Sequence, residues 1–232
     1  MGKDVIIACD FAGKAETLAF LDRFGGERPF LKIGMELYYA AGPDIVRELK
    51  ARGHKIFLDL KLHDIPNTVK KAMTVLRDLG ADVINLHAAG TKAMMEAALE
   101  GVTRPDGTRP LLIAVTQLTS TSEERMRDEL LIGAPLAETV LHYAKNAKNA
   151  GLDGVVCSPL EAGLIHGRCG DGFLTVTPGV RFADGDVGDQ VRVTTPAKAK
   201  ELGSDYIVVG RPITQAADPL AAYRRCIAEF CD

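Results

Sequence analysis

The chain carries, at residues 57–68, the stretch Phe57-Leu58-Asp59-Leu60-Lys61-Leu62-His63-Asp64-Ile65-Pro66-Asn67-Thr68. In it, a short apolar strand runs directly into an Asp-x-Lys-x-x-Asp cluster of charges. Two carboxylates that flank one ammonium keep the lysine protonated and crowd negative charge, which suits a site that donates a proton and repels an anionic group. The alternative is a salt bridge on the surface at the end of a strand.

Short apolar or β-branched runs alternate along the chain with stretches whose apolar spacing is about 3.6 residues. The eight runs are Val5–Cys9, Phe30–Ile33, Lys55–Leu60, Val83–His87, Leu111–Thr116, Gly154–Cys157, Phe173–Thr177 and Tyr206–Val209. Glycines stand where intervening helices are expected to end, at Gly53, Gly80, Gly151 and Gly203.

Eight strand–helix units in 232 residues predict an α/β protein with one domain over residues 1–232, a (β/α)8 or TIM barrel. A doubly wound open sheet is the alternative. Against it, the first strand is followed by Asp10-Phe11-Ala12-Gly13 and not by the glycine-rich turn of a dinucleotide-binding fold.

Composition narrows the class of protein. A formal net charge of -3 provides no basic field, so we expect no nucleic-acid partner. The five cysteines are odd in number and contain no Cys-x-x-Cys, which is typical of reduced thiols. No apolar run reaches the roughly 18 to 20 residues that span a bilayer, so we expect a cytoplasmic protein without a membrane partner.

Polar residues gather at the carboxyl ends of the predicted strands, where active-site side chains of such barrels project. They are Asp10, Lys32, Asp59, Lys61, His87, Thr119, Arg181 and Arg211. Charges placed at random would fall on both ends equally. The pattern therefore predicts an active site at this end of the barrel.

A phosphate site is predicted after the last strand. Gly210 lets the backbone approach an anion, Arg211 can bind it with two hydrogen bonds, and loops after strands seven and eight are the usual phosphate site of these barrels. A plain strand-to-helix turn is the alternative. Residues 181–189 form a loop on the same face that could be a lid, and Gln190 could donate an amide hydrogen to the same phosphate.

Four other residues have simpler interpretations than catalysis. For His63 we expect a structural role, because its charged neighbours suffice for the chemistry. For His87 we expect packing or hydrogen bonding, since metal sites need several convergent ligands and no His-x-Asp pair stands on the second strand. Cys9 and Cys157 have no base nearby in the sequence that would activate a nucleophile.

Taken together, these motifs make the chain closely resemble the bacterial type of orotidine 5′-phosphate decarboxylase over nearly its full length. The matching segments are residues 8–10, 32–36, 57–67, 87–90, 115–120, 177–181, 189–192 and 209–213. The charged cluster with its flanking Phe-Leu-Asp and Ile-Pro-Asn is highly specific, and the other segments fall in the right order. No position that the family uses for catalysis departs from the pattern.

The resemblance implies roles for individual residues. Lys61 would protonate C6 of the pyrimidine within a charge network of Lys32, Asp59 and Asp64, with Asp64 reaching across the interface of a homodimer. The nucleotide substrate would contact Asp10, Lys32, Ile65, Thr68, Thr119, Arg181, Gln190, Gly210 and Arg211. Of these, Asp10 and Lys32 would bind the ribose, Thr119 the pyrimidine edge, and the last four the phosphate. No metal or organic cofactor is implied.

Two other functions stay open. The keto-gulonate 6-phosphate decarboxylases and hexulose-phosphate synthases share Asp-x-Lys-x-x-Asp but use Mg²⁺, with an acidic metal ligand where this chain has Lys32. A lysine there would repel a divalent cation. A catalytically silent nucleotide-binding protein is the second alternative, and the intact Asp59, Lys61 and Asp64 argue against it, because pure binding needs no such costly charge arrangement.

Overall fold

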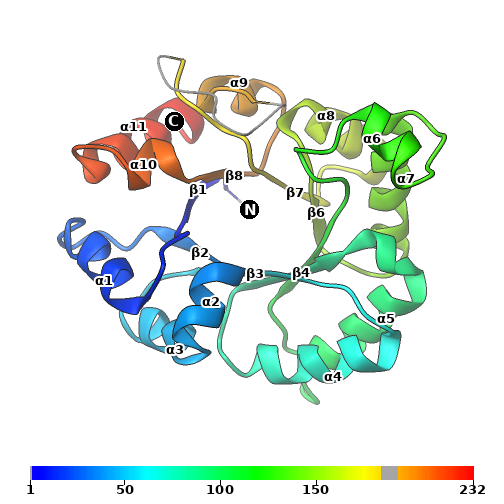
Figure 1. Ribbon diagram of the computed structural model, residues 1–232, viewed down its shortest axis with the longest axis horizontal. Coiled ribbons are helices and arrows are strands. Elements are labelled where there is room, and N and C mark those ends of the chain that lie inside the picture. The colour runs from blue at the N-terminus through cyan, green and yellow to red at the C-terminus, as the bar shows by residue number, and fades with distance from the viewer. Residues whose placement is uncertain (1, 184–192) are drawn as a thin grey trace.

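The computed structural model describes residues 2–183 and 193–232. Its eight strands are all parallel and form one closed barrel in chain order, with helices around the outside (Figure 1). The strands are β1 (Asp4–Ala8), β2 (Phe30–Gly34), β3 (Ile56–Leu62), β4 (Val83–His87), β5 (Leu111–Val115), β6 (Gly154–Val156), β7 (Leu174–Thr177) and β8 (Tyr206–Val209). The predicted (β/α)8 barrel is confirmed.

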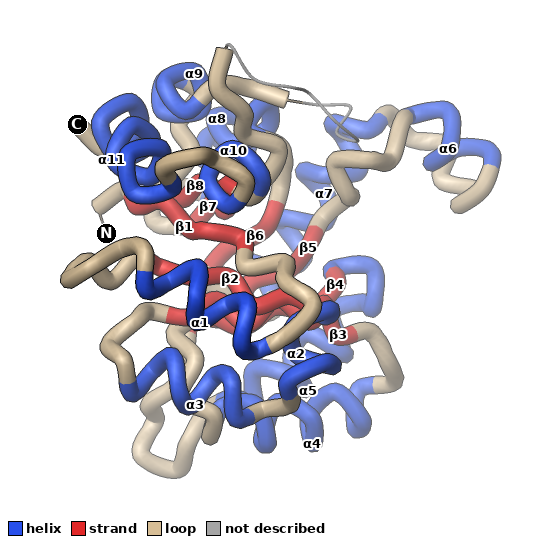
Figure 2. Tube along the Cα trace, turned by 60° about the vertical axis from the view of Figure 1, so that its left-hand side comes forward, coloured by secondary structure: helices blue, strands red, loops and turns tan. Residues whose placement is uncertain are grey.

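Helices connect successive strands, and two more follow the last strand. They are α1 (Lys14–Asp22), α2 (Met35–Ala41), α3 (Asp44–Ala51), α4 (Pro66–Arg77), the 3-10 turn η1 (Ala88–Gly90), α5 (Thr91–Val102), α6 (Glu123–Asp128), α7 (Leu136–Asn149), α8 (Pro159–Cys169), α9 (Pro196–Glu201), α10 (Arg211–Thr214) and α11 (Pro219–Phe230). The four glycines predicted to follow helices have φ between 85° and 92°, the conformation of a glycine helix end. Figure 2 shows that α6 stands away from the barrel wall. None of the helices described is long and apolar enough to cross a membrane.

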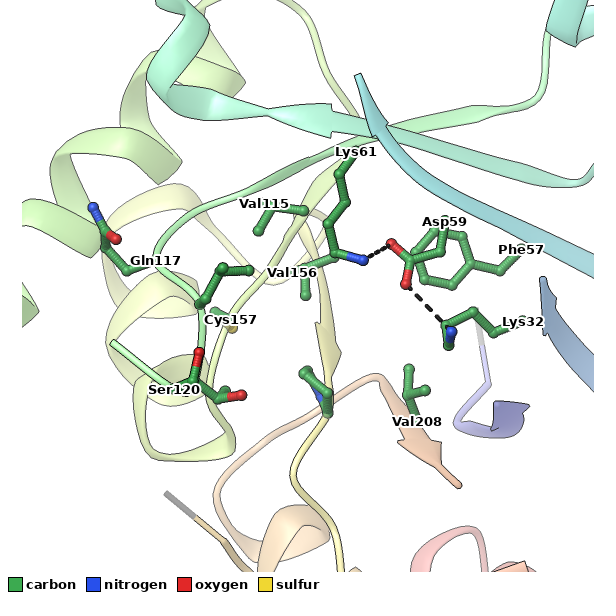
Figure 3. Close-up of a pocket in the computed structure, with 13 residues that line it drawn as sticks. Lys32, Phe57, Asp59, Lys61, Val115, Gln117, Ser120, Val156, Cys157 and Val208 are labelled. Carbon is green, nitrogen blue, oxygen red and sulfur yellow. Dashed lines mark hydrogen bonds and ion pairs between the residues drawn. The ribbon is translucent and has the colours of Figure 1, made fainter. Parts of the chain in front are cut away.

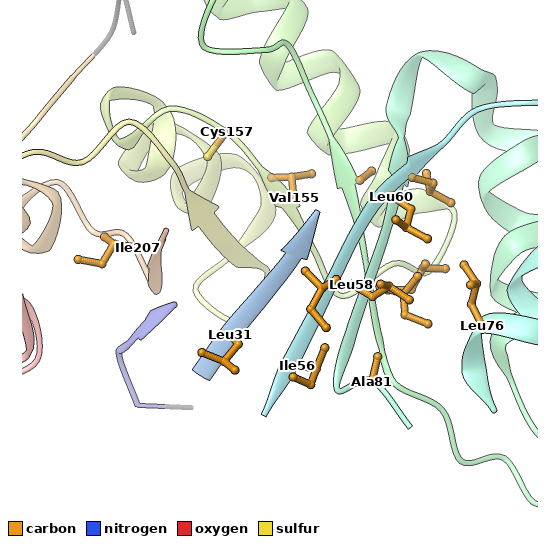
Figure 4. Close-up of a cluster of buried hydrophobic side chains, with 14 of the residues drawn as sticks. Leu31, Ile56, Leu58, Leu60, Leu76, Ala81, Val155, Cys157 and Ile207 are labelled. Carbon is orange, nitrogen blue, oxygen red and sulfur yellow. The ribbon is translucent and has the colours of Figure 1, made fainter. Parts of the chain in front are cut away.

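The core has two parts, because successive side chains of a strand point to opposite faces. Leu31, Leu58 and Ile207 belong to the larger cluster, which lies between the strands and the helices (Figure 4). The smaller cluster comes from the other strand face, which fills the barrel interior. It consists of Ile6, Ala8, Phe30, Phe57, Val83, Ile113, Val176, Tyr206 and Val208.

The interior face also carries the predicted site. Lys32 follows Phe30 by two residues on β2, and Asp59 follows Phe57 by two residues on β3, so each charge lies on the face of the interior cluster, nearer the carboxyl end. An apolar layer therefore closes the barrel below the charged groups.

The third strand corrects one prediction. We expected it to end at Leu60, but β3 continues through Leu62. Its pairing with β4 shifts in register between Leu58 and Leu62, so Asp59 and Lys61 lie within the strand and Asp64 lies beyond its end. The predicted loop over residues 101–109 is also shorter, because α5 ends at Val102.

The five cysteines, all of them among the described residues, are free thiols. Cys9, Cys157, Cys169 and Cys226 are buried and Cys231 is partly buried. Burial raises the pKa of the Cys9 thiol to about 12, far from the range in which a cysteine is a good nucleophile. This environment agrees with the expectation that Cys9 is not a catalytic nucleophile.

Candidate active site

A cavity of about 200 Å³ opens at the carboxyl ends of the strands (Figure 3). Its lining residues come from strands β2, β3, β5, β6 and β8 and from the segments that follow β5, β6 and β7. They are Lys32, Phe57, Asp59, Lys61, Val115, Gln117, Leu118, Thr119, Ser120, Val156, Cys157, Pro178 and Val208. Charged groups occupy one wall and apolar side chains most of the rest.

The Asp59 carboxylate lies between two ammonium groups (Figure 3). Its Oδ1 is 2.7 Å from Lys61 Nζ and its Oδ2 is 3.6 Å from Lys32 Nζ. The side chains of Asp59 and Lys32 are each 10% exposed, whereas the Lys61 side chain is 25% exposed. Lys61 is therefore the one of the three that a ligand in the cavity can reach most easily.

These contacts fix the protonation states. Burial raises the pKa of the Asp59 carboxyl, but the charges of Lys32 and Lys61, with hydrogen bonds from Lys61 and Asn85, outweigh it and hold the pKa below its ordinary value of 3.8. Burial lowers the pKa of Lys32, but Asp59 and Asp10 outweigh it and the pKa lies above 10.5. At neutral pH Asp59 is a carboxylate and Lys32 is an ammonium.

Asp10, in the segment that follows β1, extends the row of charged groups. Lys32 Nζ donates a hydrogen bond to Asp10 Oδ1 over 2.9 Å. This contact depends on Gly34, because a Cβ there would lie 2.9 Å from Lys32 Nζ and 3.1 Å from Asp10 Oδ1. Gly34 was quoted only as part of a matching segment, and its role becomes visible when β2 is folded beside β1.

Lys61 has an unusual backbone. Its φ of 51° lies in the left-handed region, which residues other than glycine, asparagine and aspartate seldom adopt. Its N–H donates to the Asn85 side chain, with 2.8 Å between Lys61 N and Asn85 Oδ1. The sequence did not predict Asn85 as a site residue. Its only signal was an amide in the middle of the apolar run of residues 83–87.

A second cavity, of about 410 Å³, adjoins the first. Lys32, Pro178 and Val208 line both. The second is otherwise lined by Ala8, Asp10, Gly179, Arg181, Gly210, Arg211 and Gln215. The predicted phosphate residues Arg181, Gly210 and Arg211 are thus brought together, and Gln190 lies outside the described residues.

The surroundings of the second cavity suit an anion. Among the residues that the structure describes, its lining contains two guanidinium groups, the Lys32 ammonium and one carboxylate, that of Asp10. At Gly210, an added Cβ would meet only Ala8 Cβ, at an ordinary 3.5 Å. The surrounding packing alone therefore does not require glycine at this position.

Thr119 lines the first cavity together with Gln117 and Ser120, in the segment between β5 and α6. Thr119 was predicted there. Gln117 and Ser120 were not named as candidates, although both belong to the polar run that follows the fifth strand.

Asp64, Ile65 and Thr68 line neither cavity. All three are exposed, and Ile65 is 66% exposed. Asp64 Oδ1 accepts a hydrogen bond from the N–H of Ile65 over 2.6 Å, just before α4 begins. Within the described residues of one chain, Asp59 is the carboxylate that pairs with Lys61, and Asp64 does not.

The two histidines of this region lie close to each other. The ring centroids of His63 and His87 are 5.7 Å apart. Burial, followed by the charges of His63 and Lys61, lowers the pKa of His87 below its ordinary value of 6.5, so His87 is neutral at pH 7. This environment agrees with packing as the role of His87.

Comparison with known proteins supplies the family. Residues 3–226 match the model of the orotidine 5′-phosphate decarboxylase / HUMPS family. The chain is 62% identical over 228 residues to orotidine 5′-phosphate decarboxylase of Bacillus caldolyticus, covering 97% of this chain and 93% of the relative. It is 60% identical to the protein of that name from Geobacillus thermodenitrificans, covering 97% and 95%.

A solved structure agrees with these relatives. The crystal structure of orotidine 5′-phosphate decarboxylase from Lactobacillus acidophilus superimposes with a TM-score of 0.89 at 45% identity, covering 99% of this chain and all of the other. The similarity to these relatives, in sequence and in structure, thus extends over almost the whole chain. The chain belongs to the orotidine 5′-phosphate decarboxylase family.

Proposed function

We propose that the chain converts orotidine 5′-phosphate to uridine 5′-phosphate and CO2 in pyrimidine biosynthesis. One observation carries the proposal. The cavity that holds Lys61 and Asp59 adjoins a second, arginine-lined cavity at Lys32. A ligand that fills both must have a compact group at one end and an anion at the other, as a pyrimidine nucleotide 5′-phosphate has. The relatives from Bacillus caldolyticus and Geobacillus thermodenitrificans are named for this reaction, as orotidine 5′-phosphate decarboxylases.

Lys61 would act on the reacting carbon. When the bond from C6 to the carboxylate breaks, its electron pair stays on a carbon that has no adjacent carbonyl to accept it. The ammonium of Lys61 would stabilise this pair and then donate a proton to C6, forming the new C–H bond. The site needs that ammonium charged and accessible, and Lys61 pairs with a carboxylate while keeping 25% of its side chain exposed.

Asp59 and Asp64 would keep Lys61 charged and would place negative charge beside the substrate carboxylate. Two unit charges about 4 Å apart interact by roughly 4 kcal/mol at an effective dielectric of about 20, so an aspartate there would repel the departing carboxylate substantially. Asp59 is held ionised by two ammonium groups. Asp64 would come from the second chain of a homodimer, a proposal supported by its exposed position in one chain.

The nucleotide would be held along both cavities. Arg181, Gly210 and Arg211 would bind the phosphate, with Gln190 added from its loop. Asp10 and Lys32, at the junction of the cavities, would bind the ribose. Thr119 would bind the pyrimidine edge, and Ile65 and Thr68 would reach the nucleotide from the partner chain. Binding energy from the phosphate, remote from C6, would organise the site for the reaction.

No metal or organic cofactor enters this proposal, and Lys32 argues against a metal ion in particular. The carboxylates of Asp10 and Asp59 are the natural ligands for a cation at this point, and the Lys32 ammonium lies within 2.9 Å of one and 3.6 Å of the other. A divalent cation would have to displace it. We expect the enzyme to act in the cytoplasm, in keeping with its five free thiols.

A turnover assay tests the proposal. The purified protein is incubated with orotidine 5′-phosphate, with and without EDTA, and uridine 5′-phosphate and CO2 are measured. We expect turnover that EDTA leaves unchanged. Decarboxylation of keto-gulonate 6-phosphate that needs Mg²⁺ would instead identify the other branch of the family. Binding of uridine 5′-phosphate without any turnover of orotidine 5′-phosphate would identify a silent nucleotide-binding protein.

A further inference from the structure

The register shift between β3 and β4 leaves a gap in the backbone pairing. Leu58 pairs with Ile84 and Leu62 pairs with Leu86. Between these pairs β3 has three residues, Asp59 to Lys61, whereas β4 has only Asn85. A bulge of this kind bends the strand, re-aims side chains and leaves backbone groups without their usual partners. The left-handed φ of Lys61 lies within it.

The side chain of Asn85 fills that gap. Its Oδ1 accepts a hydrogen bond from the Lys61 N–H over 2.8 Å, and its Nδ2 donates to Asp59 Oδ1 over 2.6 Å. The same Asp59 oxygen accepts the hydrogen bond from Lys61 Nζ. One amide therefore joins the backbone of the lysine to the carboxylate that pairs with its ammonium.

Chemistry dictates the orientation of this amide. A backbone N–H can only donate, and the ionised carboxylate of Asp59 can only accept. An asparagine satisfies both at once, whereas an aspartate in its ionised form and an apolar residue cannot. Asn85 is fully buried, so water cannot readily replace it.

We propose that Asn85 is a positioning residue, which holds Lys61 in its left-handed conformation and fixes the Asp59 oxygen so that the ammonium is aimed at the reacting carbon. This role rests on the proposed function. Asn85 lines neither cavity, so it acts through Lys61 and Asp59 and not on the substrate. Errors of about 1 Å in such positioning can reduce a rate by about a hundredfold.

The first test is Asn85→Ala in the full-length protein. We expect kcat to fall by about a hundredfold, while the dissociation constant of uridine 5′-phosphate changes by less than about threefold, because its phosphate site lies on other strands. Thr175→Val is the matched control. Thr175 is also fully buried on a barrel strand and also makes two side-chain hydrogen bonds, both to Asp205. We expect this variant to lose stability and keep kcat.

The second test is Asn85→Asp, which serves also if Asn85→Ala fails to fold, because it keeps the shape of the side chain and the acceptor for the Lys61 N–H. The introduced carboxyl can donate a hydrogen bond to Asp59, as the amide does, only when it is protonated. Asp59 contacts this position directly, and Lys61 and Lys32 both pair with Asp59. His87 lies two residues later on β4, with the His63 ring beside it. We therefore expect kcat of this variant to fall as pH rises from about 6 to about 9, through an ionisation that the wild type lacks.

The outcomes separate this proposal from the function on which it rests. If the wild type does not decarboxylate orotidine 5′-phosphate, the proposed function fails. If the wild type is active and Asn85→Ala keeps kcat within about threefold, or loses no more kcat than Thr175→Val, the positioning role is refuted. A pH profile and a kcat of Asn85→Asp that coincide with those of the wild type would refute it equally.

Discussion

The Lys61 ammonium lies 2.7 Å from the carboxylate of Asp59, a residue of the same strand two positions earlier in the chain. The pair is therefore built locally, and its geometry depends on one short segment of β3. The other oxygen of the carboxylate faces Lys32, which β2 supplies. Two cations thus share one anion at the wall of the first cavity, and the four predictions below concern how this row of charges is held and used.

The first prediction concerns pH. The pKa of Asp59 is lowered on folding, so the unfolded chain binds a proton here more readily than the folded one in acid. The stability from this group is complete above the ordinary pKa of 3.8 and is lost as pH falls through the lower folded value. We expect the difference in free energy of unfolding between wild type and Asp59→Asn to stay constant from about pH 7 to about pH 5 and to shrink in more acidic solution. Urea titrations of both proteins measure it; a difference that already shrinks between about pH 7 and about pH 5 would contradict the assigned protonation state.

The second prediction concerns Gly34. In Gly34→Ala the new Cβ would lie 2.9 Å from Lys32 Nζ, so the flexible end of the lysine must move away. Because a mobile side-chain end yields at little energetic cost, we expect the melting temperature to change little and kcat/KM to fall by about tenfold or more. Thermal melts and steady-state kinetics on one preparation give both numbers.

Gly13→Ala is the matched control for Gly34→Ala. Gly13 and Gly34 both precede a helix in extended backbone, but a Cβ at Gly13 meets nothing within 4 Å. We expect Gly13→Ala to keep wild-type kinetics. Equal kinetics for the two variants would show that the Lys32–Asp10 contact does not matter for turnover.

Sequence patterns predicted the local parts of this site, because neighbours in the chain are necessarily neighbours in space. The pairing of Lys61 with Asp59 follows from their spacing, and the arrival of Arg181 and Arg211 at one end of the barrel follows from eight parallel strands. The role of Asn85 could not be predicted, since it depends on the register shift between β3 and β4. The pattern of apolar residues predicts that the two strands exist, but it does not reveal how they are aligned with each other.

The same limit applies to Gly34. Its importance comes from the side-by-side packing of β1 and β2, in which Ala8 pairs with Lys32 and brings Asp10 close to the ammonium. In the sequence, Gly34 is only one of 23 glycines. Which of them accommodates a functional side chain becomes clear only when distances across strands are known.

The third prediction concerns assembly. If Asp64 serves the neighbouring barrel, a mixture of Lys61→Ala and Asp64→Ala proteins should form heterodimers in which one site lacks both residues and the other lacks neither. Activity should reappear under conditions of subunit exchange, up to about half of wild type per heterodimer, as expected for a two-fold interface. Kinetics combined with native mass spectrometry measure recovery per heterodimer.

Lys61→Ala mixed with Asp59→Ala is the control for that experiment. Asp59 pairs with Lys61 of its own chain, so each site of this heterodimer still lacks one residue and no activity should return. Heterodimers of Lys61→Ala and Asp64→Ala that stay inactive would show that each barrel uses its own Asp64.

The most direct test of the central claim, that Lys61 protonates C6 of the decarboxylated pyrimidine, is the turnover number of Lys61→Ala on orotidine 5′-phosphate, measured beside the binding of uridine 5′-phosphate. We expect decarboxylation to be lost while the nucleotide still binds, because Arg181, Gly210 and Arg211 line the second cavity, which Lys61 does not line. Retention of more than about a tenth of wild-type turnover, a change of only about 1.4 kcal/mol in the barrier, would contradict the assignment of Lys61 as proton donor.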